Sequence, residues 1–252
     1  MKHIPNLFTL LNLVAGCLAI LFALQTNAVN IYVNDGFTSS FNIPERLTWA
    51  GFCIVAAALI DFLDGFLARL LRAVSPLGKQ LDSLSDTVSF GVAPAMILYQ
   101  LLRFSYAREE NGLDISIGWL LPAFLIAVAA AYRLAVFNLD ESQATVFRGV
   151  PVPAAGLLIA SFPLILHFNP SGPVNDLVIN KWFLYGVIAV VSLLMVSRLR
   201  MMSLKPAGRS LRENGPAIGL LVLSIVAGLF LQWAAVPVIF VAYVLISIFT
   251  LK

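Results

Sequence analysis

Four aspartates in one short stretch of the chain have types and spacing that suit chemistry on a phosphate. Asp61 and Asp64 lie three residues apart, and Asp82 and Asp86 lie four apart, so each pair shares a face of a helix. Both pairs lie in apolar surroundings, where ionised side chains are costly and usually functional. Four like charges need positive charge among them, and Mg²⁺ or Mn²⁺ prefers carboxylate oxygens. Two such ions bridged by shared carboxylates suit phosphoryl transfer.

Small residues accompany the four aspartates. Gly65, Ala68 and Gly78 allow a helix or a ligand to approach closely, and beside carboxylates they leave room for a flat base and a ribose. The planar guanidinium of Arg69 suits a phosphate. The alternative is a purely structural salt-bridge network, in which Arg69 and Lys79 neutralise part of the acidic charge.

The elements that must position these residues are membrane helices. The 252 residues are 60% hydrophobic and 12% charged, which excludes an ordinary soluble domain and a disordered chain. The apolar runs are continuous rather than alternating, which favours helices over a barrel. We predict an all-α polytopic membrane helix bundle with about eight transmembrane helices, at 5–25, 47–70, 80–102, 118–138, 152–168, 181–198, 216–232 and 235–251.

The first of these segments is kept as part of the mature chain. Asn6, Thr9 and Asn12 interrupt its apolar run, which a signal peptide would not need, and no clear cleavage site follows. The three polar residues fall on one helical stripe. They can make hydrogen bonds between helices, or they can form the floor of a nucleotide site, and the sequence leaves both interpretations open.

The distribution of basic residues predicts the orientation. With the N-terminus in the cytoplasm, twelve of the sixteen lysines and arginines fall at cytoplasmic ends, and the exceptions are Arg46, Arg103, Arg108 and Lys181. This bias places both termini and the acidic site on the cytoplasmic side. The basic loop 198–212 is foremost a topology signal, with contact to anionic lipid headgroups as the alternative.

Two further predictions follow from charge and cysteine content. The net charge of +3 is too small to indicate a nucleic-acid partner. Cys17 and Cys53 both lie in apolar stretches, which argues against a disulfide framework or a zinc site.

The acidic stretch resembles the signature of the CDP-alcohol phosphatidyltransferase family at every fixed position, namely Asp61, Asp64, Gly65, Ala68, Arg69, Gly78, Asp82 and Asp86. A looser resemblance extends over residues 4–156. It implies transfer of a phosphatidyl or similar group from a CDP-linked donor to an alcohol, with release of CMP. It also implies a six-helix core in a single integral membrane domain, 1–252, usually a homodimer. We expect a catalytic core at 4–200, followed at 201–252 by the basic cytoplasmic loop and a C-terminal helical hairpin.

Carried over by position, the resemblance assigns roles to individual residues. Asp61, Asp64, Asp82 and Asp86 would hold two divalent cations, Mg²⁺ or Mn²⁺, and Asp86 would also be the catalytic general base. Binding of CDP would involve residues of the first two segments and one glycine just before the third, namely Asn6, Thr9, Asp64, Gly65, Ala68, Arg69 and Gly78.

Three other stretches resemble the phosphatidylserine synthase branch of this family: IPNLFTLLNLVAG at 4–16, SFGVAPA at 89–95, and YRLAVFN at 132–138 with FRGVPVPAAG at 147–156. The branch implies CDP-diacylglycerol and L-serine as substrates, with membrane lipids as surroundings, in a bacterial-type inner or cell membrane. Arg133, Asn138 and Arg148 are the candidates for the acceptor or a lipid phosphate. Val136 stands where an arginine is common in that branch, which removes a basic contact there.

Several alternatives remain open from the sequence. A sister enzyme would use glycerol 3-phosphate, inositol phosphate or choline as acceptor, and a phosphorylated acceptor should need a basic cluster larger than Arg133 and Arg148. Arg133 could instead pair with an aspartate, Asn138 could cap a helix, and Arg148 could be a topology signal. A cation-binding membrane transporter is the alternative from another class.

Overall fold

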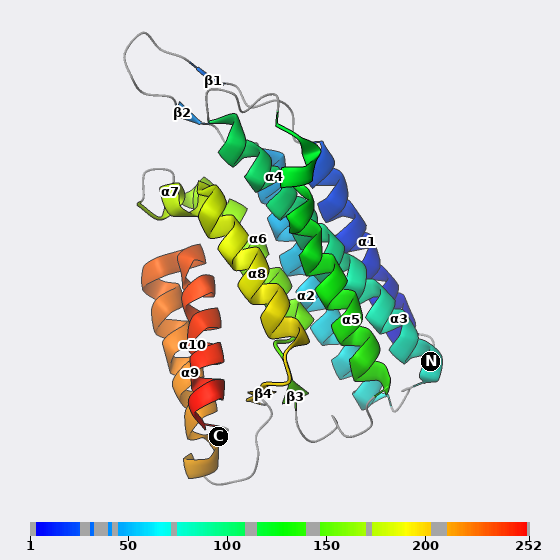
Figure 1. Ribbon diagram of the computed structural model, residues 1–252. Coiled ribbons are helices and arrows are strands. Elements are labelled where there is room, and N and C mark those ends of the chain that lie inside the picture. Colours follow the sequence, from blue (N-terminus) through cyan, green and yellow to red (C-terminus); the bar gives the residue numbers. More distant parts are fainter. Residues whose placement is uncertain are drawn as a thin grey trace.

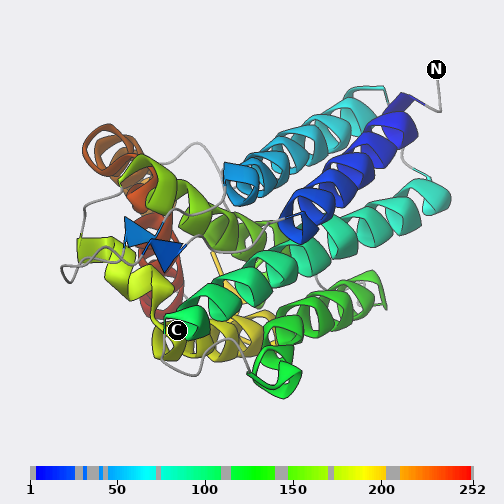
Figure 2. The ribbon, with the colours of Figure 1, turned by 90° about the horizontal axis from the view of Figure 1, so that it is seen from above.

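The chain folds into a bundle of helices, seen from the side in Figure 1 and from above in Figure 2. The computed structural model describes residues 4–25, 31–32, 40–41, 45–71, 75–108, 115–139, 147–169, 173–202 and 211–250. The α-helices are α1 (Ile4–Leu24), α2 (Glu45–Leu70), α3 (Pro76–Asp86), α4 (Ala93–Ala107), α5 (Leu125–Leu139), α6 (Val152–Phe168), α7 (Pro173–Ile179), α8 (Lys181–Val196), α9 (Leu211–Leu231) and α10 (Ala235–Thr250). Two short antiparallel pairs join β1 (Ile31–Tyr32) to β2 (Ser40–Phe41) and β3 (Phe147–Arg148) to β4 (Arg200–Met201).

The expected all-α polytopic membrane bundle is confirmed. Among the described residues, five helical segments are long and apolar enough to cross a membrane, and α6 and α8 are shorter apolar helices. The last of the five, Gly215–Phe249, reverses direction at a 3₁₀ turn over Gln232–Ala234, where Gln232 has a φ of 49°. It therefore forms the predicted hairpin of α9 and α10, and all eight predicted segments coincide with helices.

The third predicted segment begins earlier than expected and is not a uniform helix. The predicted start at 80 is wrong, because α3 begins at Pro76, behind Ser75, whose Oγ accepts a hydrogen bond of 3.0 Å from the Gly78 N–H. Proline in the first helical turn and serine at the N-cap are favourable start residues. A π-helical turn, Thr87–Val92, then joins α3 to α4.

Helix α1 is the element that brings the acidic helices together. It packs against α2, α3 and the π-helical turn, and it lies between α2 and the α3–α4 helix in Figure 2. The approach to the π-helical turn is close, because a Cβ atom at Gly16 would lie 2.5 Å from Ser89 Oγ and 2.8 Å from Ser89 Cα. The expected convergence of the aspartates on two helices therefore depends on a third helix.

The same turn is enclosed from other sides. Phe90 is fully buried and packs on Gly156 of α6, where a Cβ atom would lie 3.0 Å from the phenylalanine. A Cβ atom at Gly91 would likewise lie 3.0 Å from the Cβ atom of Ala130 on α5. The π-helical turn follows directly after Asp86 and is therefore packed closely against three other helices, α1, α5 and α6.

We predict that Gly16→Ala lowers the thermal unfolding midpoint in detergent. The added methyl group collides with main-chain as well as side-chain atoms of Ser89, and overpacking of this kind costs about 1–3 kcal/mol. The matched control is Gly219→Ala in α9, where a Cβ atom would meet nothing within 4 Å. Because alanine has a higher helix propensity than glycine, this variant should not lower the midpoint. Equal midpoints for the two variants would contradict the close packing of α1 on the π-helical turn.

Candidate active site

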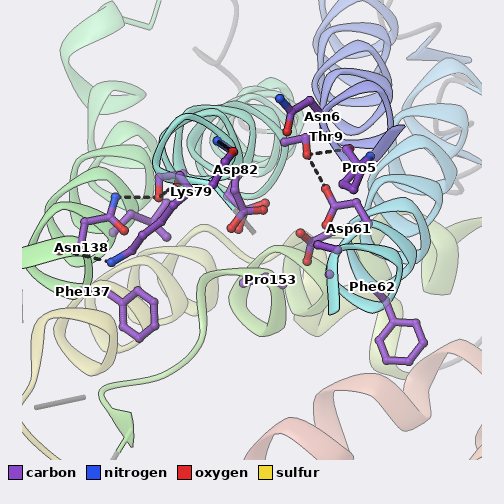
Figure 3. Close-up of a pocket in the computed structure, with 18 of the residues that line it drawn as sticks. Pro5, Asn6, Thr9, Asp61, Phe62, Lys79, Asp82, Phe137, Asn138 and Pro153 are labelled. Carbon is purple, nitrogen blue, oxygen red and sulfur yellow. Dashed lines mark hydrogen bonds between the residues drawn. The ribbon is translucent and has the colours of Figure 1, made fainter. Parts of the chain in front are cut away.

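A cavity of about 550 Å³ opens where α2 ends and α3 begins (Figure 3), and α1, α5 and the start of α6 complete its wall. All four aspartates of the acidic stretch line it. So do the other residues expected at the CDP site and two of the three acceptor candidates, namely Asn6, Thr9, Gly65, Ala68, Arg69, Gly78, Arg133 and Asn138. Arg148 does not line this cavity.

Three of the aspartates form a compact group that could hold a divalent cation. One carboxylate oxygen from each of Asp61, Asp64 and Asp82 lies within 4.8 Å of the other two. Several carboxylate oxygens around one point suit a hard cation, so the donor set fits Mg²⁺ or Mn²⁺. Asp86 lies one turn further along α3, is 6% exposed and is outside this group of three.

The acidic residues form no salt bridges within the described part of the chain. No lysine or arginine there forms an ion pair with any of the four aspartates. Lys79 instead donates to the main-chain oxygen of Asn138 at 3.3 Å and lies 6.0 Å from the centroid of the Phe137 ring. The salt-bridge network that the sequence left open is therefore not formed, and the negative charge remains available to a cation.

The polar stripe of α1 supplies hydrogen bonds to the carboxylates. Thr9 Oγ1 donates to Asp64 Oδ2 at 2.7 Å, a bond drawn in Figure 3. Asn12 Nδ2 donates to Asp86 Oδ1 at 3.1 Å. Of the two interpretations of this stripe, these contacts support hydrogen bonds between helices for Thr9 and Asn12. Asn6 faces Gly78, where a Cβ atom would lie 3.1 Å from the Asn6 amide oxygen.

Two of the acceptor candidates carry buried polar atoms without partners. Arg133 is 9% exposed, and its Nη2 donates to the Gly149 oxygen at 3.5 Å, but its Nε has no hydrogen-bond partner. Asn138 Nδ2 donates to Ser83 Oγ at 2.8 Å, while its Oδ1 has none. Asn138 therefore ties the end of α5 to α3 across the cavity wall rather than capping its own helix.

A second cavity, of about 320 Å³, gathers basic side chains that the sequence did not connect. Arg133, Arg148 and Arg198 line it together. From the sequence, Arg198 was interpreted as part of a topology signal or of a contact with lipid headgroups. Its contribution here depends on the end of α8 and the adjoining β3–β4 pair. No spacing pattern in the sequence links residue 198 to residue 133, so the chain alone gave no signal for this grouping.

Comparison with known proteins gives consistent results. The family model for CDP-alcohol phosphatidyltransferase matches residues 2–194. Proteins named CDP-diacylglycerol–serine O-phosphatidyltransferase are similar to this chain. The Helicobacter pylori protein is 33% identical over 78% of this chain and 70% of its own length. The Bacillus subtilis protein is 33% identical over 72% and 89%, and the Mycobacterium tuberculosis protein is 28% identical over 96% and 76%.

We predict that Asp61→Asn and Asp82→Asn weaken binding of Mn²⁺ to the purified protein. Each substitution removes a negative ligand from the group of three, and loss of outer-shell partners alone already costs about 10–100-fold in metal affinity. The measurement is a titration followed by the electron paramagnetic resonance signal of free Mn²⁺. Asp176→Asn serves as the control, because Asp176 lies on α7 and pairs with Arg108 at 3.5 Å. Unchanged affinity in both cavity variants would refute a metal site at these residues.

Proposed function

The chain belongs to the CDP-alcohol phosphatidyltransferase family, and on this premise we propose that it transfers the phosphatidyl group of CDP-diacylglycerol to the hydroxyl of L-serine. The products are phosphatidylserine and CMP. The similar proteins from three bacteria carry the name of this activity. We assign the reaction to the acidic cavity of this integral membrane helix bundle.

The similar proteins, all named for serine as the acceptor, carry the choice of serine, and two unpartnered polar atoms of opposite kind are compatible with it. Arg133 Nε can only donate a hydrogen bond and Asn138 Oδ1 can only accept one, and both residues line the carboxylate cavity. Buried polar atoms are normally paired. Both atoms are covered in this structure, so a ligand with an anionic and a cationic group would complement them once the two side chains turn toward the cavity. The carboxylate of serine fits the arginine, and its ammonium group fits the asparagine oxygen.

The cavity provides a place for each reacting group. Asp61, Asp64 and Asp82 would hold the divalent cations, Mg²⁺ or Mn²⁺, which supply charge neutralisation for the diphosphate and the departing CMP. Gly65 leaves open space beside the cluster, since a Cβ atom there would meet nothing within 4 Å. That space suits the nucleotide, and the guanidinium of Arg69 lines the same wall for a phosphate oxygen.

Asp86 is the proposed general base. The sequence also made it a candidate metal ligand, and its position outside the group of three favours the role of base. It takes the proton of the serine hydroxyl while the serine oxygen attacks the phosphatidyl phosphorus in line. The new bond joins that oxygen to phosphorus, the bond from phosphorus to the CMP oxygen breaks, and CMP carries away the electron pair. A serine hydroxyl is a weak nucleophile, so its placement against a base matters as much as the base itself.

Sidedness and assembly are part of the same proposal. The cavity lies at the end of the bundle that holds the described N- and C-terminal ends (Figure 1). Arg69, Lys79, Arg148 and Arg198 are on elements at that end, and a basic excess marks the cytoplasmic side. We place the active site and both termini in the cytoplasm and expect a homodimer. The basic residues at 203–210, and the terminal lysines Lys2 and Lys252, lie outside the described residues.

One observation favours the alternative acceptors. The second cavity brings Arg133, Arg148 and Arg198 together, which is a larger basic cluster than the two arginines expected from the sequence. Such a cluster suits a phosphorylated acceptor such as glycerol 3-phosphate or inositol phosphate. Neither of these offers an ammonium group for Asn138, whereas serine does. Choline offers a cation but no anion for Arg133.

The acceptor is tested by CMP release from CDP-diacylglycerol and Mn²⁺ with purified protein. Serine, glycerol 3-phosphate, inositol phosphate and choline are supplied in parallel. We expect serine to support release well above background and the other three to remain near it. Release with another acceptor but not with serine would reject the serine assignment, and ion flux without any CMP release would favour a transporter.

We expect Asp86→Asn to lower turnover with serine by at least about 100-fold, since a positioned base contributes roughly 10²–10⁴-fold. Asparagine has the shape of aspartate, so the thermal unfolding midpoint should change little. The comparison variant is again Asp176→Asn, which should keep full activity. Full activity of a folded Asp86→Asn protein would remove Asp86 from the chemistry.

A further inference from the structure

The aspartate proposed as general base is held by a residue of another helix. Asn12 Nδ2 donates to Asp86 Oδ1 at 3.1 Å, and the two side chains are 0% and 6% exposed. We propose that Asn12 is a positioning residue for Asp86, which fixes the rotation of the carboxylate so that its other oxygen, Oδ2, receives the serine proton. This inference rests on the proposed function and deepens it.

Asn12 is itself held rigidly, which a positioning residue requires. Its main-chain oxygen accepts a hydrogen bond of 2.9 Å from Ser89 Oγ, in the π-helical turn that follows Asp86. Gly16 allows that approach, since a Cβ atom there would collide with Ser89. The side chain of Asn12 therefore reaches Asp86 at the end of α3, while its main chain is fastened three residues further along. Single π-helical turns often occur at functional sites.

Thr9 and Asn12 divide the stripe of α1 between two roles. Thr9 donates a hydrogen bond to Asp64. Asp64 belongs to the group of three aspartates whose carboxylate oxygens lie within 4.8 Å of one another, so loss of the Thr9 hydroxyl should disturb the metal site. Asn12 bonds Asp86, which is outside that group, so its loss should disturb proton removal. The two substitutions therefore predict different kinetic signatures, which a merely structural role for either residue would not produce.

The test compares Asn12→Leu with Thr9→Val in CMP-release kinetics and Mn²⁺ titration. Leucine has the size of asparagine without its hydrogen bonds. For Asn12→Leu we expect kcat to fall about 100-fold, the scale for a misplacement near 1 Å, with KM for both substrates and the Mn²⁺ affinity within about threefold of wild type. For Thr9→Val we expect Mn²⁺ affinity to fall about tenfold or more.

A matched control and a rescue variant complete the experiment. Thr48→Val removes a buried hydroxyl of α2 that has no hydrogen-bond partner, and it should leave kcat and Mn²⁺ affinity unchanged. Asn12→Gln keeps the amide donor and should recover at least about tenfold of the lost kcat. If Asn12→Leu does not fold, as judged by its thermal unfolding, Asn12→Ala replaces it.

The outcomes separate this inference from the proposed function. If wild-type protein uses serine and Asn12→Leu or Asn12→Ala keeps its kcat, the inference alone is overturned. Loss of kcat together with an equal loss of Mn²⁺ affinity also overturns it, because Asn12 would then act on the metal group. If another acceptor replaces serine, the serine assignment fails and the same comparison decides on Asn12 with that acceptor. Absence of CMP release with every acceptor overturns both.

Discussion

Repulsion among four carboxylates that face one cavity is the constraint on which this structure depends. Within the described residues no lysine or arginine forms an ion pair with them, and ionised groups inside a membrane need a compensating partner. Helix α1 offers hydrogen bonds through Thr9 and Asn12 but no charge. A divalent cation would supply this compensation, and three aspartate oxygens within 4.8 Å of one another suit one. The acidic group is thus free of salt bridges in the described part of the chain, as the proposed metal site requires.

The bundle holds this repulsive arrangement by packing rather than by charge. Helix α1 lies between α2 and α3 (Figure 2), and its close contact at Gly16 fastens it to the π-helical turn after Asp86. The N-cap at Ser75 fixes where α3 begins. Sites on rigid, well-packed elements hold reacting groups more accurately than sites on loops. Beside the cluster, a Cβ atom at Gly65 would meet nothing within 4 Å, which is compatible with the nucleotide site proposed there.

Much of this arrangement could be predicted from the sequence, because membrane helices and carboxylate spacing leave strong local signals. Continuous apolar runs predicted all eight helical segments, and the eight residues of the acidic signature all line the cavity. The start of α3 was missed although Ser75 and Pro76 signal it. No residue pattern in the sequence predicts the π-helical turn, which contacts three other helices. A stripe of polar residues shows which face is polar but not what it meets, so the partners of Thr9 and Asn12 required the structure. The grouping of Arg198 with Arg133 and Arg148 likewise depends on tertiary packing.

The most direct test of a cation held by the acidic cluster is the anomalous scattering of Mn²⁺ in crystals of the protein grown with Mn²⁺ and CDP. We predict an anomalous peak between Asp61, Asp64 and Asp82, with carboxylate oxygens at about 2.0–2.3 Å, the range for hard divalent cations, and with the CDP diphosphate against the same peak. Well-ordered CDP in this cavity with no anomalous peak beside these aspartates, or a peak only elsewhere on the protein, would contradict the account.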